Sequence, residues 1–134
     1  MKNPTLINYL KVQFQNNTDK VEAVFDALYE KIQQSSEQVP FEVCNLKGDG
    51  ISKEEFGIVL KKAYIDMIPY NCFYVDGQIL FYDQEFVKEN CPAKYVLFRA
   101  LRYTYIYIPE AESRIPLQYF KDRYQLNNLW NIFE

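Results

Sequence analysis

Histidine is absent from the 134 residues of this chain. Its absence excludes Ser-His-Asp and Cys-His catalysis, a histidine general base and histidine-ligated zinc. Any acid–base chemistry must therefore use carboxylates, lysine, tyrosine or cysteine. Cysteine is scarce, with three widely spaced residues and no C-x-x-C pair. An odd number of cysteines without a framework is typical of a reducing compartment, so we expect a cytoplasmic protein.

Long apolar runs and an excess of positive charge are also missing. The longest apolar stretch, Tyr95–Ile108, is interrupted by Arg99 and Arg102 and is too short to cross a bilayer. The first ten residues contain no apolar signal segment. With a net charge of −3 and no long basic run, the chain would be repelled by a phosphate backbone. We therefore expect no membrane span and no nucleic-acid partner.

Aromatic residues are abundant and make up 17% of the sequence, while hydrophobic residues together reach 49%. This is enough apolar surface for a folded core, and the length favours one domain. A buried tyrosine needs a partner for its hydroxyl. The twelve tyrosines therefore predict that part of the surface is half-buried or faces another protein.

Helical periodicity predicts an α+β domain that is mostly helical. Apolar residues three and four apart indicate helices over about 4–15, about 20–34 and 92–107, and another from Pro116. The helix over 92–107 is apolar on most sides, which predicts a central position. A last amphipathic turn begins near Leu129.

Ser52 and Glu55 form a capping-box pattern, in which a serine is followed three residues later by a glutamate. We expect this box to open a helix that ends near Tyr64, because Pro69 prevents its continuation. One face of this helix would carry four apolar residues: Phe56, Val59, Leu60 and Ala63. Upstream, Val39–Cys44 is expected to form a short strand or extended segment.

Two short β-prone runs, Cys72–Val75 and Gln78–Tyr82, are joined by Asp76-Gly77. An Asp-Gly pair between two such runs is a strong signal for a β-hairpin. A hairpin brings its far end back beside its start. Residues just before the first strand and just after the second are therefore expected to face each other.

The segment before the hairpin reads Asp66-Met67-Ile68-Pro69-Tyr70-Asn71, and Asp83-Gln84-Glu85 follows the hairpin. Phosphoryl transfer uses parts of this kind. One carboxylate accepts or orients the proton of the nucleophile, and an amide oxygen and a second carboxylate hold Mg²⁺ against the phosphates. Asp, Pro and Asn are also common turn residues, so the first segment taken alone equally fits a tight turn.

The stretch from Ser52 to Phe86 resembles the catalytic loop, strand pair and metal loop of the protein-kinase and aminoglycoside-phosphotransferase superfamily, whose loop runs D-x-x-x-x-N. The resemblance implies that Asp66 corresponds to the catalytic base and Asn71 and Asp83 to metal ligands. The Asp83-Gln84-Glu85 ending is similar to the D-x-E of small-molecule phosphotransferases, which adds Glu85 to the candidate Mg²⁺ ligands. The implied fold is a set of kinase C-lobe-like helices around a central β-hairpin, with Mg²⁺ and ATP as candidate cofactors.

A narrower resemblance covers Asp66 through Glu89-Asn90-Cys91-Pro92 to Phe98-Arg99-Ala100. This run is similar to the C-terminal region of bacterial polypeptides that carry a class I S-adenosylmethionine (SAM)-dependent methyltransferase domain. Such proteins are associated with surface-polysaccharide assembly, and some join the methyltransferase to a kinase-like module. The resemblance implies that SAM would bind only to an absent neighbouring domain, and that this methyltransferase domain is the partner.

On this reading residues 1–134 are a single kinase C-lobe-like domain excised from a longer chain. The expected parts are a helical lead-in, a loop-and-hairpin core and a helical end: 1–36, 52–86 and 92–134.

Several parts of a kinase are missing. Tyr64 and Ile65 stand where the family has His and Arg before the catalytic Asp, and no Gly-rich loop precedes them. The first fifty residues are predicted to be helical and not a five-stranded N-lobe. We therefore expect an accessory pseudokinase-like module of a transferase. The alternatives are an active Mg²⁺-dependent phosphotransferase that takes its ATP-binding half from another domain, and a non-enzymatic helical protein-interaction domain.

The run Asn45–Phe56 resembles an EF-hand calcium loop. With Gly50 at the invariant glycine, Lys47 and Phe56 stand where carboxylates belong. We therefore expect a turn followed by a capped helix in place of a calcium site.

Three basic residues share the helix over 92–107: Lys94, Arg99 and Arg102. We expect a solvated stripe, or pairing with Glu110 or Glu112, with an anion site as the alternative. Three tyrosines near its end are expected in core or interface packing, with sugar contact as the alternative: Tyr103, Tyr105 and Tyr107. Cys72 and Cys91 are expected to be unreactive packing residues.

Overall fold

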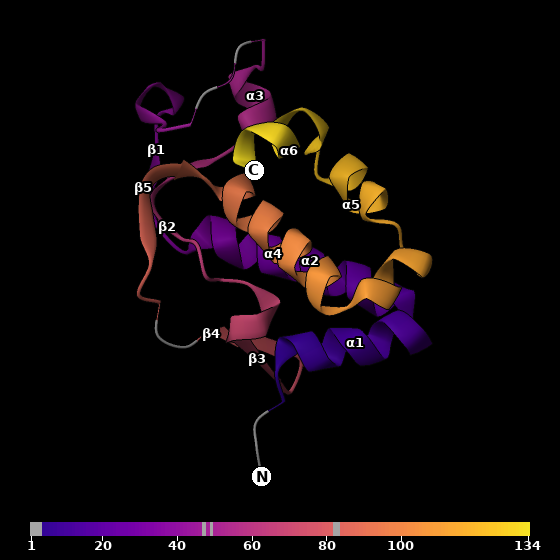
Figure 1. Cartoon of the computed structure of the whole chain (residues 1–134). Coiled ribbons are helices and arrows are strands. Elements are labelled where there is room, and N and C mark those ends of the chain that lie inside the picture. Colours follow the sequence, from indigo (N-terminus) through magenta and orange to yellow (C-terminus); the bar gives the residue numbers. More distant parts are fainter. Residues whose placement is uncertain (1–3, 47, 49, 82–83) are drawn as a thin grey trace.

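The computed structural model describes residues 4–46, 48, 50–81 and 84–134. Across these residues the chain is an α+β domain with more helix than strand, which confirms the predicted fold class at that level. A three-stranded and a two-stranded antiparallel sheet lie to one side of the helices (Figure 1). None of the helices in the described ranges combines the length and the apolar character that a bilayer crossing needs.

The first two helices are α1, Leu6–Asn16, and α2, Thr18–Gln34. Thr5 caps α1 by accepting a hydrogen bond at its side chain from the Asn8 N–H at 3.3 Å. Both helices bury one stripe and leave the opposite face in solvent, as their periodicity predicts. The buried residues of the stripe on α2 are Val21, Val24, Phe25, Leu28 and Ile32.

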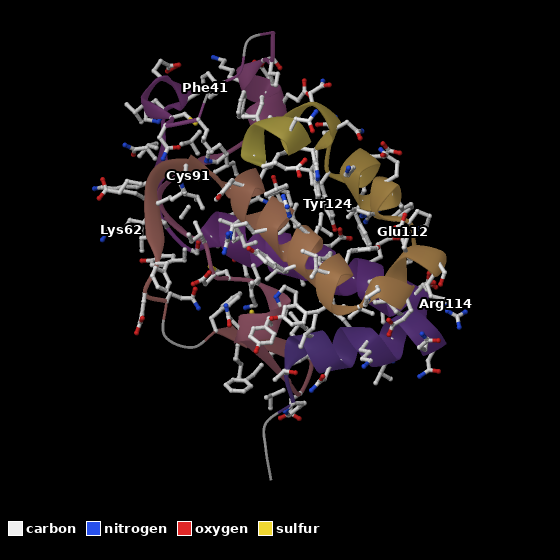
Figure 2. All side chains as sticks on the ribbon, viewed as in Figure 1. Phe41, Lys62, Cys91, Glu112, Arg114 and Tyr124 are labelled. Carbon is white, nitrogen blue, oxygen red and sulfur yellow. The ribbon has the colours of Figure 1, made fainter. Side chains whose placement is uncertain are left out.

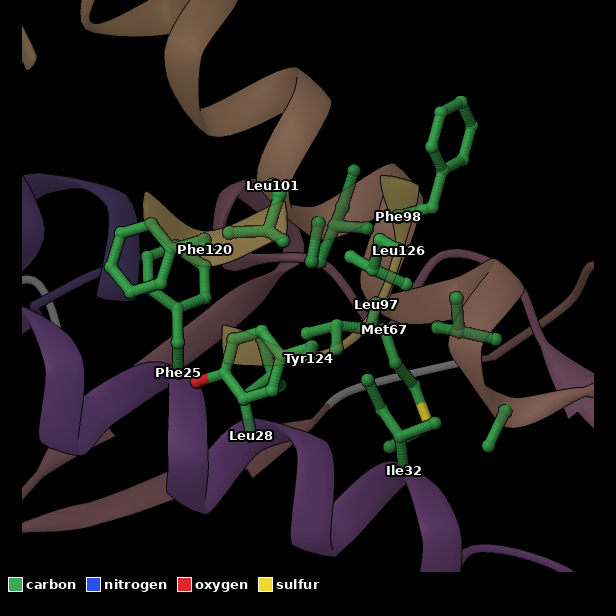
Figure 3. Packing of buried hydrophobic residues seen from close by; sticks show 14 of the residues in the cluster. Phe25, Leu28, Ile32, Met67, Leu97, Phe98, Leu101, Phe120, Tyr124 and Leu126 are labelled. Carbon is green, nitrogen blue, oxygen red and sulfur yellow. The ribbon is translucent and has the colours of Figure 1, made fainter. Parts of the chain in front are cut away.

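The central element is α4, Ala93–Tyr107, which crosses α2 in the middle of the molecule (Figure 1). Its central position confirms the prediction from its apolar surface. After it come a 3₁₀ turn, Pro109–Ser113, and the short helices α5, Leu117–Arg123, and α6, Asn127–Phe133. Figure 3 shows the resulting core, where side chains of α2 and α4 meet Phe120 and Tyr124 from the α5 region.

The predicted helix from Ser52 to Tyr64 is wrong after its first turn. The helix α3 covers only Lys53–Phe56, although Ser52 caps it as expected, accepting at Oγ from the Glu55 N–H at 3.2 Å. Gly57 ends the helix at a φ of 74°, a conformation that favours glycine. Strand β2 then covers Val59–Tyr64, so Val59, Leu60 and Ala63 reach the core from a strand.

The partner of β2 is β5, Val87–Pro92, which the sequence pattern did not predict. A two-residue strand β1, Gln38–Val39, completes the sheet in the order β1-β2-β5. The predicted extended segment over Val39–Cys44 is correct only at its start, because Phe41–Val43 form a 3₁₀ turn. Burial in this sheet changes along the strands: Cys91 lies opposite Leu60 and both are fully buried, whereas Lys62 lies opposite Glu89 and both are exposed (Figure 2).

The predicted hairpin is confirmed as β3, Cys72–Val75, and β4, Gln78–Phe81. Asp76 and Gly77 have φ values of 51° and 75°, as a tight turn of the primed type requires. The free edge of β3 is bound to the start of α1, because the Tyr74 N–H donates to the Pro4 carbonyl at 2.9 Å. The hairpin thus lies against α1, while α4 occupies the centre of the fold.

Candidate functional site

Two connections join the three-stranded sheet to the hairpin. Tyr64 at the end of β2 pairs with Val87 at the start of β5, and Cys72 pairs with Phe81 in the hairpin. Residues 65–71 and 82–86 therefore both run from the three-stranded sheet to the hairpin. The Ile65 N–H donates to the Phe86 carbonyl at 3.2 Å, so the described ends of the two connections lie side by side.

The loop Asp66–Asn71 is anchored to the core by its apolar residues. Met67, Ile68 and Pro69 are buried, and Ile68 is extended, as the residue before a proline usually is. Pro69 then begins a 3₁₀ turn that ends at Asn71, whose N–H donates to the Ile68 carbonyl at 2.8 Å. This arrangement leaves the polar residues of the loop at its surface.

Asp66 forms an ion pair with Arg99 of α4, at 3.1 Å between Oδ1 and Nη2. The same guanidinium donates through Nε to the Ile65 carbonyl at 2.8 Å. The two side chains retain only 27% and 20% exposure, so the pair is mostly shielded from water. Arg99 also lies 5.2 Å from the ring centre of Tyr103. One arginine thus fixes both the backbone and the carboxylate at the start of the loop.

Asn71 lies in the same loop and closes it. Its Nδ2 donates to the Asp66 carbonyl at 3.2 Å. The structure therefore brings together Asp66 and Asn71, two of the predicted site residues, through a contact between the amide and the backbone.

The other two predicted metal ligands are placed differently. Asp83 lies outside the described residues, and Glu85 is exposed just before β5. Among the residues that the structure describes, no group of three carboxylates or thiols is positioned to hold a metal ion. The Mg²⁺ site thus stays a prediction, for which the described residues supply Asn71 and Glu85, with Asp66 as the predicted catalytic base.

An aromatic surface borders the loop. Tyr70 stacks on Tyr107 from the end of α4, with ring centres 4.7 Å apart and planes 10° apart. The two tyrosines are 49% and 50% exposed, so the stack is presented to solvent. Burial by its neighbours and the adjacent Tyr70 and Tyr103 phenols raise the pKa of Tyr107. We call Tyr70, Tyr103 and Tyr107 the loop-side aromatic surface.

Sequence reasoning missed Tyr70 and the role of Arg99. A signal for Tyr70 was available, because it lies between Pro69 and Asn71 in a loop whose preceding residues are apolar. No local signal identifies Arg99, which is 33 residues away from Asp66 in the chain.

The expectation for the basic residues of α4 is corrected by their contacts. Arg99 pairs with Asp66, and Arg102 pairs with Glu134 at 3.0 Å, so neither pairs with Glu110 or Glu112. Lys94 is not solvated, because its Nζ donates to the Glu55 carbonyl at 2.8 Å and to the Gln125 carbonyl at 3.4 Å. The three cations of α4 are thus bound to separate partners, Lys94 and Arg99 to backbone carbonyls and Arg102 to Glu134, and do not form a solvated basic stripe.

The remaining predictions concern a loop, tyrosines and thiols. The EF-hand-like run includes Lys47 and Asp49, which lie outside the described residues, and continues into the predicted capped turn. The Tyr105 hydroxyl donates to the Ile115 carbonyl at 2.6 Å, in line with the expected packing role. Burial raises the pKa of both the Cys72 and Cys91 thiols to about 12, so they are protonated and unreactive at neutral pH.

Searches of protein-family models, of curated proteins and of solved structures each gave no match to this chain.

Proposed function

We propose that this chain is a non-catalytic, kinase-like accessory module that contacts a partner protein through the loop-side aromatic surface. The partner we propose is a bacterial SAM-dependent methyltransferase domain that acts in surface-polysaccharide assembly. The sequence resemblance supports the class of partner. The geometry of the loop supports the mode of action.

The observation that carries this proposal is how the loop uses its groups. The Asp66 carboxylate contacts Arg99, and the Asn71 amide nitrogen contacts the loop backbone. These polar groups thus keep the loop in shape, while Tyr70 and Tyr107 stack with half of each ring in solvent. Rigid, half-exposed tyrosines are enriched at protein interfaces because they bury much area at a low entropy cost.

The direct test measures association between this chain and the methyltransferase domain by isothermal titration calorimetry. Truncating both stacked rings, Tyr70→Ala with Tyr107→Ala, should raise the dissociation constant at least about tenfold. Tyr119→Ala removes a comparably exposed tyrosine of α5 and serves as the matched control. Equal affinities for the two variants would remove the aromatic surface from the proposal, and no association of the unaltered chain would remove the partner.

An active Mg²⁺-dependent phosphotransferase is the second candidate. It is favoured by the hydrogen bond from the Ile65 N–H to the Phe86 carbonyl, which places the described ends of the two connections side by side. This reading requires Mg²⁺-dependent ATP binding that Asp83→Ala abolishes and that Glu89→Gln, on the neighbouring strand β5, leaves intact. For the accessory module we expect no Mg²⁺-dependent ATP binding by the unaltered chain at about 1 mM nucleotide.

A further inference from the structure

A groove separates α2 from the β3–β4 hairpin, far along the hairpin from the loop Asp66–Asn71. It has a volume of about 590 Å³, within the range of roughly 300–1,000 Å³ that is usual for small-molecule sites. Tyr9 of α1 and Gly77 at the hairpin turn help to line it. The groove thus involves three elements that packing already fixes relative to one another.

The floor of the groove is apolar and its wall is aromatic. Ala23 and Ala27 present small side chains on successive turns of α2, and the buried Ile79 lies across from them. Tyr9 and Tyr74 stack with ring centres 4.1 Å apart and planes 31° apart. A flat or cyclic group can lie on the alanines beside the tyrosine pair without displacing a large side chain.

The charge of the groove is positive in a protein of net charge −3. Lys20 and Lys31 both line it, and none of the described residues that line it is acidic. They lie on the same helix, eleven residues or roughly 16 Å apart along its axis. Neither forms an ion pair with any of the residues the structure describes. Two uncompensated ammonium groups beside apolar walls concentrate anions locally.

Tyr74 and Lys20 both line the groove, which therefore offers a phenol and an ammonium group. Burial and the neighbouring Tyr9 phenol raise the pKa of Tyr74, whereas the positive charge of Lys20 lowers it. Hydroxyl donors next to an ammonium group are suited to the oxygens of a phosphate or carboxylate.

A second groove, of about 440 Å³, has the opposite charge. It is lined by Glu54, Glu55 and Asp122, with Ser, Gln and Asn residues, and none of its lining residues that the structure describes is basic. The α2–hairpin groove is therefore distinguished by its charge as well as by its shape.

We propose that the α2–hairpin groove binds a small organic anion in which a phosphate or carboxylate is attached to a ring. The ring lies on Ala23 and Ala27 beside Tyr74, and Lys20 or Lys31 binds the anionic group. This binding is separate from the contact proposed for the loop-side aromatic surface, and either can fail without the other.

The test is an NMR titration of the full chain with phenyl phosphate. We expect saturable shifts of the amides of Ala27, Tyr74 and Gln78. Inorganic phosphate, which lacks the ring, and phenol, which lacks the charge, should each bind at least about tenfold more weakly. Shifts that centre on Asp66–Asn71, or equal binding of all three probes, would overturn the proposal.

Matched variants separate the groove from general surface charge. The double variant Lys20→Gln with Lys31→Gln should weaken phenyl phosphate binding at least about tenfold. Lys11→Gln with Lys62→Gln, which removes two exposed charges elsewhere, should leave binding unchanged. Ala27→Phe should block the groove without changing charge. If phenyl phosphate binds the Lys20→Gln, Lys31→Gln variant or the Ala27→Phe variant as well as the unaltered chain, the proposed site is wrong. It is also wrong if the chain binds an acidic peptide but not phenyl phosphate.

Discussion

Single side chains of this protein bridge segments that are far apart in the sequence. Arg99 binds both Ile65 and Asp66, and Lys94 binds the carbonyls of Glu55 and Gln125. Burying a cation is costly unless hydrogen bonds compensate, and here backbone carbonyls supply them. In the case of Lys94, burial lowers its pKa, while the nearby Glu55 charge raises it. These residues read as a basic stripe in the sequence because their partners cannot be inferred from spacing.

The Arg99–Asp66 pair can be tested by removing its cation. Arg99→Met leaves a shielded carboxylate and an unbound carbonyl, so we expect the free energy of unfolding to fall by about 1–3 kcal/mol. Arg102→Met breaks a pair in which both side chains are 43% exposed, and the loss should stay below about 1 kcal/mol. Urea unfolding measures both. Equal losses would mean that the pair with Asp66 does not hold the loop.

At the scale of elements, the short helix α5 is attached to α2 by a charged cluster. Arg123 contacts Glu22 and Asp26, while the Tyr119 and Tyr124 hydroxyls donate to the same two carboxylates. The hydrogen bond from Arg123 lowers the pKa of Asp26 below 3.8, with Tyr124 acting in the same direction and burial opposing it.

This cluster predicts an acid-dependent stability. Because the pKa of Asp26 is lower in the folded state, its contribution is present above about pH 3.8 and is lost as the pH falls through the folded value. Asp26→Asn and Arg123→Met should each flatten the decrease in stability below pH 4. As the control, Arg114→Met removes only a hydrogen bond to the uncharged Gln15. This variant should keep the full decrease in stability below pH 4. The measurement is the unfolding midpoint at each pH from 2.5 to 6. If its dependence on pH is unchanged in both Asp26→Asn and Arg123→Met, Asp26 is not the source of the acid-dependent stability.

Sequence periodicity predicted the helices and the hairpin because their signals are local. The Asp76-Gly77 turn and the stripe of α2 each depend on residues within a few positions. The segment Val59–Tyr64 carries apolar residues at helical spacing, yet it is a strand because Gly57 ends α3 and β5 pairs with it about 28 residues later. That partner, Val87–Pro92, contains the polar run Lys88-Glu89-Asn90 and ends in proline, so it shows no strand pattern of its own.

For the candidate site, the chain order gave Asp66 and Asn71 as neighbours in one loop, and the structure agrees. The stacking of Tyr70 on Tyr107 joins residues 37 positions apart and depends on how α4 crosses the loop. The α2–hairpin groove depends on three elements at once. Both features arise from tertiary packing, which no window of the sequence contains.

At the scale of the whole molecule, the buried thiols of Cys72 and Cys91 can be used to measure how often the fold opens. Cys72 and Cys91 are fully buried, and burial raises the pKa of each from 9.0 to about 12, so the thiolate population is about a thousandfold lower. We expect iodoacetamide at pH 8 to label them only as fast as the fold opens, with a steep increase in urea. Peptide mapping separates these sites from Cys44, and rapid labelling of either one in the native protein would contradict the packing.

The pairing of β2 with β5 sets a limit on protein engineering. The D-x-x-P-x-N hexapeptide depends on groups outside it, because the strands on either side of it are paired and Arg99 binds Asp66 from α4. Grafting residues Asp66–Asn71 onto another scaffold would transfer their sequence but not the conformation of the loop. A graft would have to include at least the interval from β2 to Arg99 on α4, together with α1, against which Pro69–Asn71 and β3 pack.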